Sequence, residues 1–155
     1  MKKRSLYSPG GAATGNVGTG EDDLKSFTLP ANSLAYNGDY VEAYMRFTVA
    51  NNANQKRLKI WVGGTAVFDT QPTGLAVSTA YAIWVHLVLL RTASNVQTGW
   101  INYVANGGIL GGVGIDLTKT DTADIIIKAT GETNAASNND VTQQFLIVKP
   151  GEHTV

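Results

Sequence analysis

The sequence predicts an all-β protein, an antiparallel β-sandwich of jelly-roll-like form with an extended N-terminal arm. Three observations support this fold class. Apolar and polar residues alternate with a period of two in several segments, clusters of glycine and asparagine separate these segments, and no stretch of helical length has a helical apolar period. The segments number about eight or nine, which suits the two sheets of a jelly roll. An immunoglobulin-like sandwich is the alternative, although the chain lacks the Cys…Trp…Cys pattern of that fold.

The chain divides into three parts, namely an arm at residues 1–20, a sandwich domain at residues 21–150 and a short C-terminal tail at residues 151–155. The arm has little apolar periodicity, and glycines dominate its second half. A disordered tail is the alternative interpretation of such a segment. An ordered glycine-rich arm needs a surface to lie against, which is either its own domain or a neighbouring subunit.

The first strands follow from turn signals and from alternation. Residues 24–29 form a strand that Pro30 ends, and Tyr36-Asn-Gly-Asp39 is a turn. Residues 40–49 alternate without interruption, so one face of this strand is expected to be buried. The buried face carries Val41, Ala43, Met45, Phe47 and Val49, and the opposite face carries Tyr40, Glu42, Tyr44, Arg46 and Thr48.

A hairpin and two longer strands come next. Residues 57–62 alternate again, with Leu58, Ile60 and Val62 on the buried face, and two glycines join them to a strand at residues 65–69. Residues 79–91 form the longest apolar strand, which is apolar on both faces, and a strand at residues 95–104 follows it.

The last third of the chain completes the sheets. Residues 106–114 contain five glycines and are expected to form a loop before a short strand at residues 113–117. Residues 123–130 and 141–148 are the final strands. A polar loop at residues 131–140 separates them, and Pro150-Gly151 ends the domain.

Composition excludes several classes of function. Twelve Lys and Arg residues balance twelve Asp and Glu residues, and zero net charge argues against broad nucleic-acid binding. The absence of cysteine excludes a disulfide framework and thiolate metal sites. The longest apolar run, residues 82–90, is too short for a membrane-spanning helix, and the N-terminus does not read as a secretory signal. We therefore expect no nucleic-acid or membrane partner, and no cofactor or metal.

The sequence shows no arrangement of residues that is typical of an enzyme. There is no Gly-x-Ser-x-Gly motif, and the glycines at residues 10–15 lack the Lys-Ser/Thr pair of a phosphate loop. Glu21-Asp22-Asp23 is expected to be a solvated acidic loop rather than a calcium site. We expect no enzymatic activity. A small hydrolase is the remaining enzyme hypothesis, and only loops 106–112 and 131–140 could hold its site.

The two histidines are expected to have structural roles. They lie far apart in the sequence, and neither has a neighbouring nitrogen or sulfur ligand. His86 lies mid-strand among large apolar residues, so we expect a core or interface imidazole whose charge changes near pH ~6.5. His153, near the end of the chain, is expected to be solvated.

Aromatic side chains on the outward faces are candidates for binding. Tyr40, Tyr44 and Trp61 lie opposite the faces assigned to the core. Tyrosine and tryptophan are enriched where one side chain meets both apolar and polar surroundings, at interfaces and sugar sites. Three interpretations stay open, namely packing against a neighbouring subunit, carbohydrate binding, and cover by the arm. The expected subunit interface consists of Tyr40, Tyr44, Trp61, Trp84 and His86.

Four motifs in the first half of the chain belong together. They are Gly15-Asn-Val-Gly-Thr-Gly-Glu-Asp-Asp-Leu24, Lys25-Ser-Phe-Thr-Leu-Pro30, Asn51-Asn-Ala-Asn54, and Leu58-Lys-Ile-Trp-Val-Gly-Gly64 with Thr-x-Val-Phe-Asp after it. This set, over residues 14–70, resembles a group of tailed-bacteriophage virion proteins and tail-fibre modules. The resemblance implies a small β-sandwich, commonly trimeric, on the outside of a virion.

The resemblance further implies a capsid decoration (cement) protein. Such proteins carry terminal arms that reach adjacent capsid subunits, and this chain has no shaft, coiled-coil heptads or fibre repeat. On this hypothesis the chain is a homotrimer that binds the major capsid protein on the outer surface of the phage head, after synthesis in the bacterial host cytoplasm. A receptor- or carbohydrate-binding module of a tail fibre is the alternative. The arm contact is expected at Lys2, Lys3, Arg4, Leu6 and Tyr7.

Overall fold

The protein is built from β-strands throughout the part that the structure, a computed structural model, describes. That part comprises residues 11–70, 81–105 and 108–151. Within it there are ten strands and no helix. The strands are β1 (Thr14–Gly15), β2 (Gly20–Leu29), β3 (Tyr40–Val49), β4 (Lys56–Val62), β5 (Thr65–Asp69), β6 (Tyr81–Ala93), β7 (Val96–Ala105), β8 (Gly108–Leu117), β9 (Ile125–Thr133) and β10 (Val141–Gly151).

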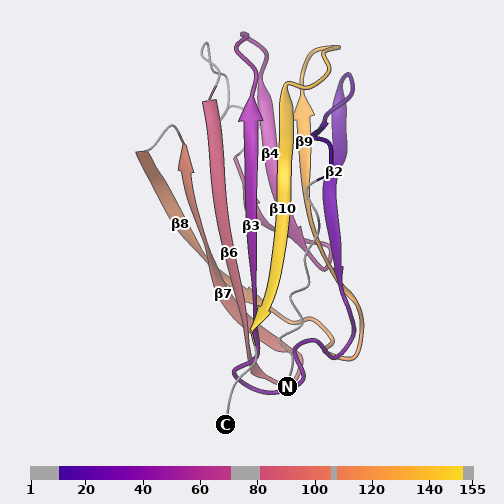
Figure 1. Cartoon of the computed structure of the whole chain (residues 1–155), viewed down its shortest axis with the longest axis vertical. Coiled ribbons are helices and arrows are strands. Elements are labelled where there is room, and N and C mark those ends of the chain that lie inside the picture. The colour runs from indigo at the N-terminus through magenta and orange to yellow at the C-terminus, as the bar shows by residue number, and fades with distance from the viewer. Residues whose placement is uncertain (1–10, 71–80, 106–107, 152–155) are drawn as a thin grey trace.

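The strands form two sheets that pack face to face. The six-stranded sheet has the order β1-β10-β3-β6-β7-β8, and the four-stranded sheet has the order β2-β9-β4-β5. All neighbouring strands are antiparallel. In Figure 1, β4 of the four-stranded sheet is seen behind β3 and β10 of the six-stranded sheet. The predicted jelly-roll-like antiparallel sandwich is confirmed. Among the described residues, no helix is long and apolar enough to cross a membrane.

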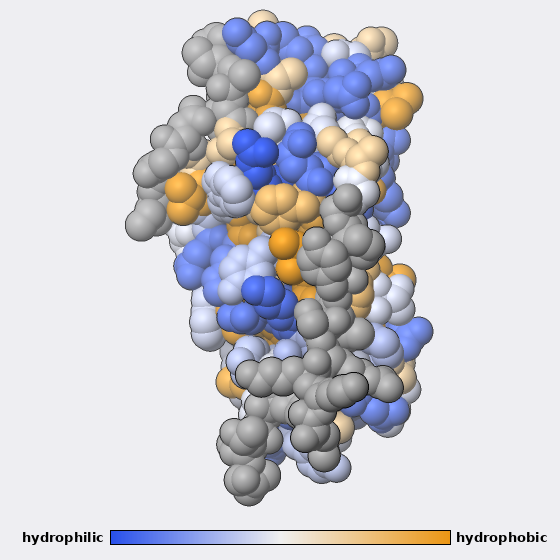
Figure 2. All heavy atoms as spheres, in the orientation of Figure 1, coloured by the Kyte–Doolittle hydropathy of each residue, from blue (hydrophilic) through white to orange (hydrophobic). Residues whose placement is uncertain are grey.

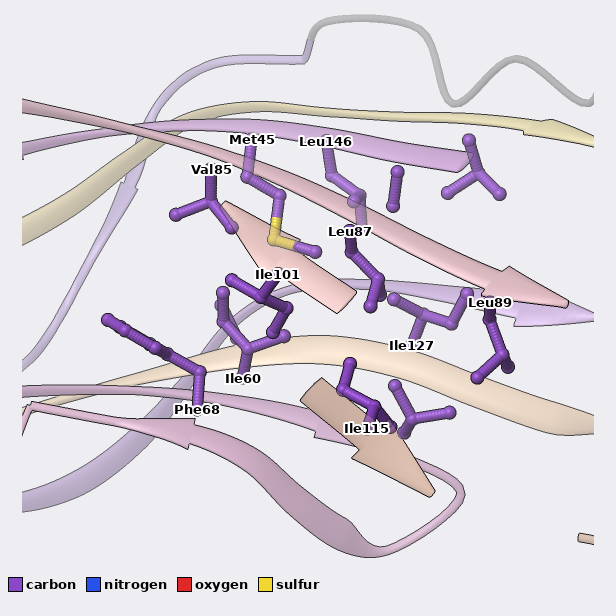
Figure 3. Close-up of a cluster of buried hydrophobic side chains, with 14 of the residues drawn as sticks. Met45, Ile60, Phe68, Val85, Leu87, Leu89, Ile101, Ile115, Ile127 and Leu146 are labelled. Carbon is purple, nitrogen blue, oxygen red and sulfur yellow. The ribbon is translucent and has the colours of Figure 1, made fainter. Parts of the chain in front are cut away.

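The hydrophobic core fills the space between the two sheets. The five residues predicted for the buried face of β3 are at most 1% exposed, and the three predicted for β4 are fully buried, so both predictions are confirmed. Each large apolar side chain buried in this way contributes about 1.5–3 kcal/mol. Figure 3 shows side chains of the two sheets pointing toward one another, among them Met45, Val85, Leu87, Leu89, Ile101, Ile115 and Leu146 from the six-stranded sheet and Ile60, Phe68 and Ile127 from the four-stranded sheet.

The glycine-rich stretch at residues 106–114 was expected to be a loop, and this prediction is wrong where the stretch is described. β8 runs through it and pairs with β7 from Ala105↔Gly108 to Gln97↔Leu117. Because β7 supplies a partner for the backbone hydrogen bonds, pairing overrides the low strand propensity of glycine. Residues 106–107 lie outside the described residues.

Several strands are longer than the alternation predicts. β2 begins at Gly20 rather than at residue 24, and β9 continues to Thr133. β10 continues through Pro150 to Gly151, so the proline does not end it. β1 pairs only with the start of β10, at Thr142 and Gln143. Near Pro150, the side of β10 that faces away from β3 has no neighbouring strand within the described ranges, so a residue without an N–H group is tolerated there. Residues 79–80, predicted as the start of the long strand, lie outside the described residues.

Part of the predicted arm lies against the protein's own domain. Thr14–Gly15 pairs with β10 at Gln143 and Thr142. The next residue, Asn16, is fully buried; its Nδ2 donates to the carbonyl of Ser137 over 3.0 Å, and its Oδ1 accepts from the N–H of Val141 over 2.9 Å. The surface that residues 14–16 lie against is therefore the domain itself. Residues 1–10 lie outside the described residues.

A buried carboxylate joins the β3–β4 loop to the β9–β10 loop. Asp140 is 1% exposed, and its two oxygens accept hydrogen bonds from Asn52 Nδ2 (2.7 Å), Asn54 Nδ2 (2.8 Å), Thr133 Oγ1 (2.8 Å) and Ser137 Oγ (3.1 Å). Burial alone would raise the pKa of Asp140. The four hydrogen bonds outweigh burial and hold the pKa below its ordinary value.

A second buried carboxylate lies near the β6–β7 turn. Asp121 Oδ2 accepts from Arg91 Nε and from the N–H of Asn95, both over 2.7 Å, and Oδ1 accepts from Gln97 Nε2 over 2.9 Å. Burial acts to raise the pKa of Asp121, but the hydrogen bonds from Asn95, Arg91 and Gln97 together lower it below its ordinary value. Both carboxylates are therefore better stabilised as anions in the folded chain than in the unfolded chain.

These two shifts predict a loss of stability in acid. A carboxyl group whose pKa is lower in the folded state stabilises the fold above its unfolded pKa, and that stability is lost as pH falls through the folded pKa. The free energy of unfolding should therefore stay level from neutral pH down to about 5 and fall below about 4. Urea unfolding measured at a series of pH values tests this. If the free energy of unfolding of an Asp140→Asn variant falls as steeply with decreasing pH as that of the parent chain, Asp140 is not a source of the loss of stability in acid.

Candidate functional site

The outer face of the six-stranded sheet carries most of the outward aromatic residues predicted to bind a partner. Antiparallel pairing aligns outward side chains in rows that cross the strands. Neighbouring residues within a row are about 4.8 Å apart, and successive rows are about 7 Å apart along the strands. Read from β10 through β3 and β6 to β7, the rows are Phe145, Arg46, Trp84 and Val104; then Ile147, Tyr44, His86 and Asn102; then Lys149, Glu42, Val88 and Trp100; and then Gly151, Tyr40, Leu90 and Thr98.

A shallow hollow of about 390 Å³ lies on the first two of these rows. Its walls come from β3, β6, β7 and β10, which are brought together only by the strand order. Figure 2 looks onto this face and shows hydrophobic residues in its middle, with hydrophilic residues around them. The residues that line the hollow are Tyr44, Met45, Trp84, Val85, His86, Asn102, Val104, Phe145, Ile147 and Lys149.

Trp84 presents an open ring at this hollow. The residue is 48% exposed, and its ring is tilted against that of Phe145 with centroids 5.7 Å apart. The guanidinium carbon of Arg46 lies 5.1 Å from the centroid of the Trp84 ring, a cation–π contact. The ring is therefore held on two sides by protein and remains accessible to a ligand.

A second aromatic pair lies in the next row. The rings of Tyr44 and His86 stack with centroids 4.5 Å apart and planes 8° apart, and Lys149 Nζ lies 5.0 Å from the centroid of the Tyr44 ring. Burial and, after it, the charge and hydrogen bond of Glu42 raise the pKa of Tyr44. The phenol of Tyr44 is therefore a neutral hydroxyl at neutral pH and is poorly suited to act as a base.

Two nitrogen atoms on this face have no hydrogen-bond partner. Among the described residues, the buried side-chain nitrogen and oxygen atoms without a partner are Arg46 Nε and His86 Nε2. His86 Nε2 lies 3.4 Å from Glu42 Oε1, close enough for an ion pair when the imidazole is protonated, but without hydrogen-bond geometry. Buried polar groups in native proteins are rarely unpaired, so two on one face need an explanation.

The five residues predicted for a subunit interface do not lie together. Tyr40, Tyr44, Trp84 and His86 are on the outer face of the six-stranded sheet. Trp61 is on the outer face of the four-stranded sheet, where its Nε1 donates to Thr130 Oγ1 over 3.0 Å. Strand alternation places a residue inward or outward, but only sheet membership decides which outward surface it joins.

The structure also changes the expected surroundings of His86 and of the acidic cluster. His86 is half-buried on an outward face and stacks on an aromatic ring, so it does not belong to the core. Residues Glu21, Asp22 and Asp23 lie within β2 rather than in a loop before it, and their partners include Lys59 and Lys128. In the described part of the chain, no three His, Cys, Asp or Glu residues are grouped so that they could hold a metal ion.

Sequence reasoning missed four residues of this face. Arg46 was assigned outward with Tyr44, and its alternation could have marked it as a binding residue. Phe145, Lys149 and Asn102 lie on other strands, and the alternation of residues along a strand does not show which strands lie next to it in the sheet. The expected arm contacts Lys2, Lys3, Arg4, Leu6 and Tyr7 lie outside the described residues, as does His153.

Comparison with known proteins leaves the family open. No protein-family model and no curated protein matches the chain. A legume lectin-like domain from Entamoeba histolytica is 10% identical, with a TM-score of 0.37 over 95% of this chain and 87% of that chain. An alginate lyase mutant in complex with an alginate trisaccharide is 11% identical, with a TM-score of 0.32 over 84% of this chain and 82% of that chain. Likenesses with TM-scores this low carry no inference about function.

Proposed function

We propose that the protein is a carbohydrate-binding module and that the outer face of its six-stranded sheet is the binding surface. One observation carries the proposal. The exposed ring of Trp84 shares this face with two buried nitrogen atoms without partners, Arg46 Nε on the neighbouring strand and His86 Nε2 in the next row. A sugar has an apolar C–H face that packs on an aromatic ring, and hydroxyls around its edge that pair with polar groups. Such a ligand matches both features at once.

The unpaired atoms favour a sugar over a purely apolar partner surface. Both atoms are already shielded from water in the free protein, where each unpaired buried group costs about 1–3 kcal/mol, and an apolar partner surface would leave that cost in place. A hydroxyl group accepts from an N–H and donates to an imidazole nitrogen, so it suits either state of His86. The hollow is also within the range of small-molecule sites, about 300–1,000 Å³.

At the β8 edge of the binding surface, outward positions are occupied by glycine, so no side chains stand up there. Gly112 and Gly114 of β8 stand opposite Asn102 and Trp100 at outward positions. Nothing lies within 4 Å of the position that a Cβ of Gly114 would occupy. Trp100 is 46% exposed, so a second ring is available on the same face beyond the hollow. A glycan longer than one sugar could therefore extend from Trp84 toward Trp100.

The capsid-decoration function expected from the sequence stays a prediction. Its arm contacts lie outside the described residues, and the homotrimer, the major capsid protein partner and the place on a phage head remain predictions with it. The expectation that the chain is not an enzyme is likewise a prediction. A carbohydrate-binding role agrees with the alternative that the sequence left open, a receptor- or carbohydrate-binding module of a tail fibre.

Replacing Trp84 by alanine should weaken glycan binding by at least about tenfold, because it removes the ring on which the sugar packs. A glycan array with the full chain identifies the bound oligosaccharide, and calorimetric titration then compares variants. Trp61→Ala is the matched control, because it removes the same side chain from the opposite surface. Equal losses in the two variants, or a parent chain that binds no glycan, would contradict the proposal.

A further inference from the structure

The cations of the binding face differ from most cations elsewhere in the described chain. Arg57, Lys59, Arg91 and Lys128 each pair with a carboxylate. Arg46 and Lys149 have no ion-pair partner among the described residues, and each instead lies over an aromatic ring, that of Trp84 and that of Tyr44 respectively. Neither charge is matched by an ion pair within the described residues, although Lys149 stands directly opposite Glu42 in the pairing of β10 with β3.

The acidic residues on this face lie away from the head group of Arg46. Glu42 is two rows from Arg46 along β3, about 14 Å of strand, and lies beside His86 and Tyr44. Asp116 stands at the far row on β8, where it accepts a hydrogen bond from Thr98 Oγ1 over 2.9 Å. At the end of the hollow near Trp84, the local charge is therefore positive.

Arg46 is also only partly used as a donor. Its Nε has no partner, and its guanidinium is fixed in place by the Trp84 ring beneath it. A guanidinium presents a planar set of N–H groups that matches the two oxygens of a carboxylate or sulfate, and fixing its plane reduces the entropy lost on binding. A sugar packed on Trp84 would have its substituents beside this group.

We infer that the carbohydrate carries an anionic group, a carboxylate or a sulfate, that Arg46 binds beside the Trp84 ring, with Lys149 over the Tyr44 ring as a second cation further along the same face. This inference rests on the proposed function and specifies its ligand. The aromatic ring supplies affinity for any sugar of suitable shape. The two cations supply the preference for an acidic sugar over its neutral counterpart.

The test compares pairs of glycans that differ only in charge. Oligogalacturonate and its methyl ester probe the carboxylate, and dextran sulfate and dextran probe the sulfate. We expect the full chain to bind the acidic member of at least one pair roughly tenfold more tightly than the neutral member, with a preference that shrinks as salt is raised. A chain that binds both members of each pair equally overturns the inference and leaves the proposed function standing, whereas a chain that binds no glycan overturns both.

Two substitutions assign the preference to the named cations. Arg46→Met and Lys149→Met keep an apolar stem on the aromatic ring and remove the charge. We expect each to weaken binding of the acidic glycan severalfold more than binding of the neutral glycan, so that the preference for the acidic glycan falls. Lys128→Met, on the outer face of the four-stranded sheet, is the matched control. Lys149 is exposed, so its variant tests the inference even where Arg46→Met fails to fold. An unchanged preference in the variants that fold overturns the inference.

Discussion

Replacing Asp140 by alanine is expected to lower the free energy of unfolding by about 3–5 kcal/mol. The carboxylate is the common acceptor for four side-chain donors, from Asn52 and Asn54 in the β3–β4 loop, Thr133 at the end of β9 and Ser137 in the β9–β10 loop. Removing it leaves these donors without their acceptor in a place that water reaches poorly. The loss of a buried acceptor costs more than a typical hydrogen bond contributes, because its partners keep their desolvation penalty.

The same substitution would also leave a buried cation without a compensating charge. Lys56 is 1% exposed, and its Nζ donates to the carbonyl of Asn52 over 2.8 Å. Burial lowers the pKa of Lys56, and the negative charge of Asp140 acts in the opposite direction. Without Asp140 the ammonium group of Lys56 is less well stabilised in the fold, which adds to the destabilisation.

Chemical denaturation of the Asp140→Ala variant measures this effect directly. Asp140→Asn should lower the free energy of unfolding by less than Asp140→Ala does, because the amide oxygen keeps one acceptor in place. Asp116→Ala is the matched control, since Asp116 is an exposed carboxylate with a single hydroxyl donor, and its loss should lie within about 0.5 kcal/mol of zero. If Asp140→Ala costs no more than Asp116→Ala, the buried carboxylate does not hold the two loops together.

Replacing Gly99 by alanine is expected to cost about 3 kcal/mol, although only one methyl group is added. A Cβ at residue 99 would lie 1.9 Å from the carbonyl oxygen of Val88, 2.9 Å from its carbonyl carbon and 3.1 Å from the Cα of Leu89. All three atoms belong to the backbone of β6. They cannot move aside as the end of a flexible side chain can, so β6 and β7 must separate at this point.

Gly114→Ala provides the control for this prediction. Gly114 lies on the neighbouring strand β8, and a Cβ there would meet nothing within 4 Å. Its alanine variant should be as stable as the parent chain within about 0.5 kcal/mol. Thermal unfolding of the two variants gives the comparison. Equal stability would mean that β6 and β7 do not approach as closely at Gly99 as the structure shows.

The sequence determined the local structure wherever alternation was strong. The inward and outward faces of residues 40–49 and the hairpin at 57–69 were predictable, because side chains of a strand point to opposite faces in turn. The same signal placed Tyr40, Tyr44 and Arg46 on an outward face. It failed at β8, because glycines carry no side-chain pattern, and the pairing of β8 with β7 is a contact between distant backbone segments.

The tertiary structure alone decided which residues form the candidate site. Alternation marks Trp61 and Tyr44 equally as outward, yet they lie on opposite surfaces, because their strands belong to different sheets. Phe145, Arg46 and Trp84 meet only because β10, β3 and β6 are neighbours in the six-stranded sheet. Strand order depends on hydrogen bonds between segments far apart in the chain, and a local pattern of apolar residues contains no information about it.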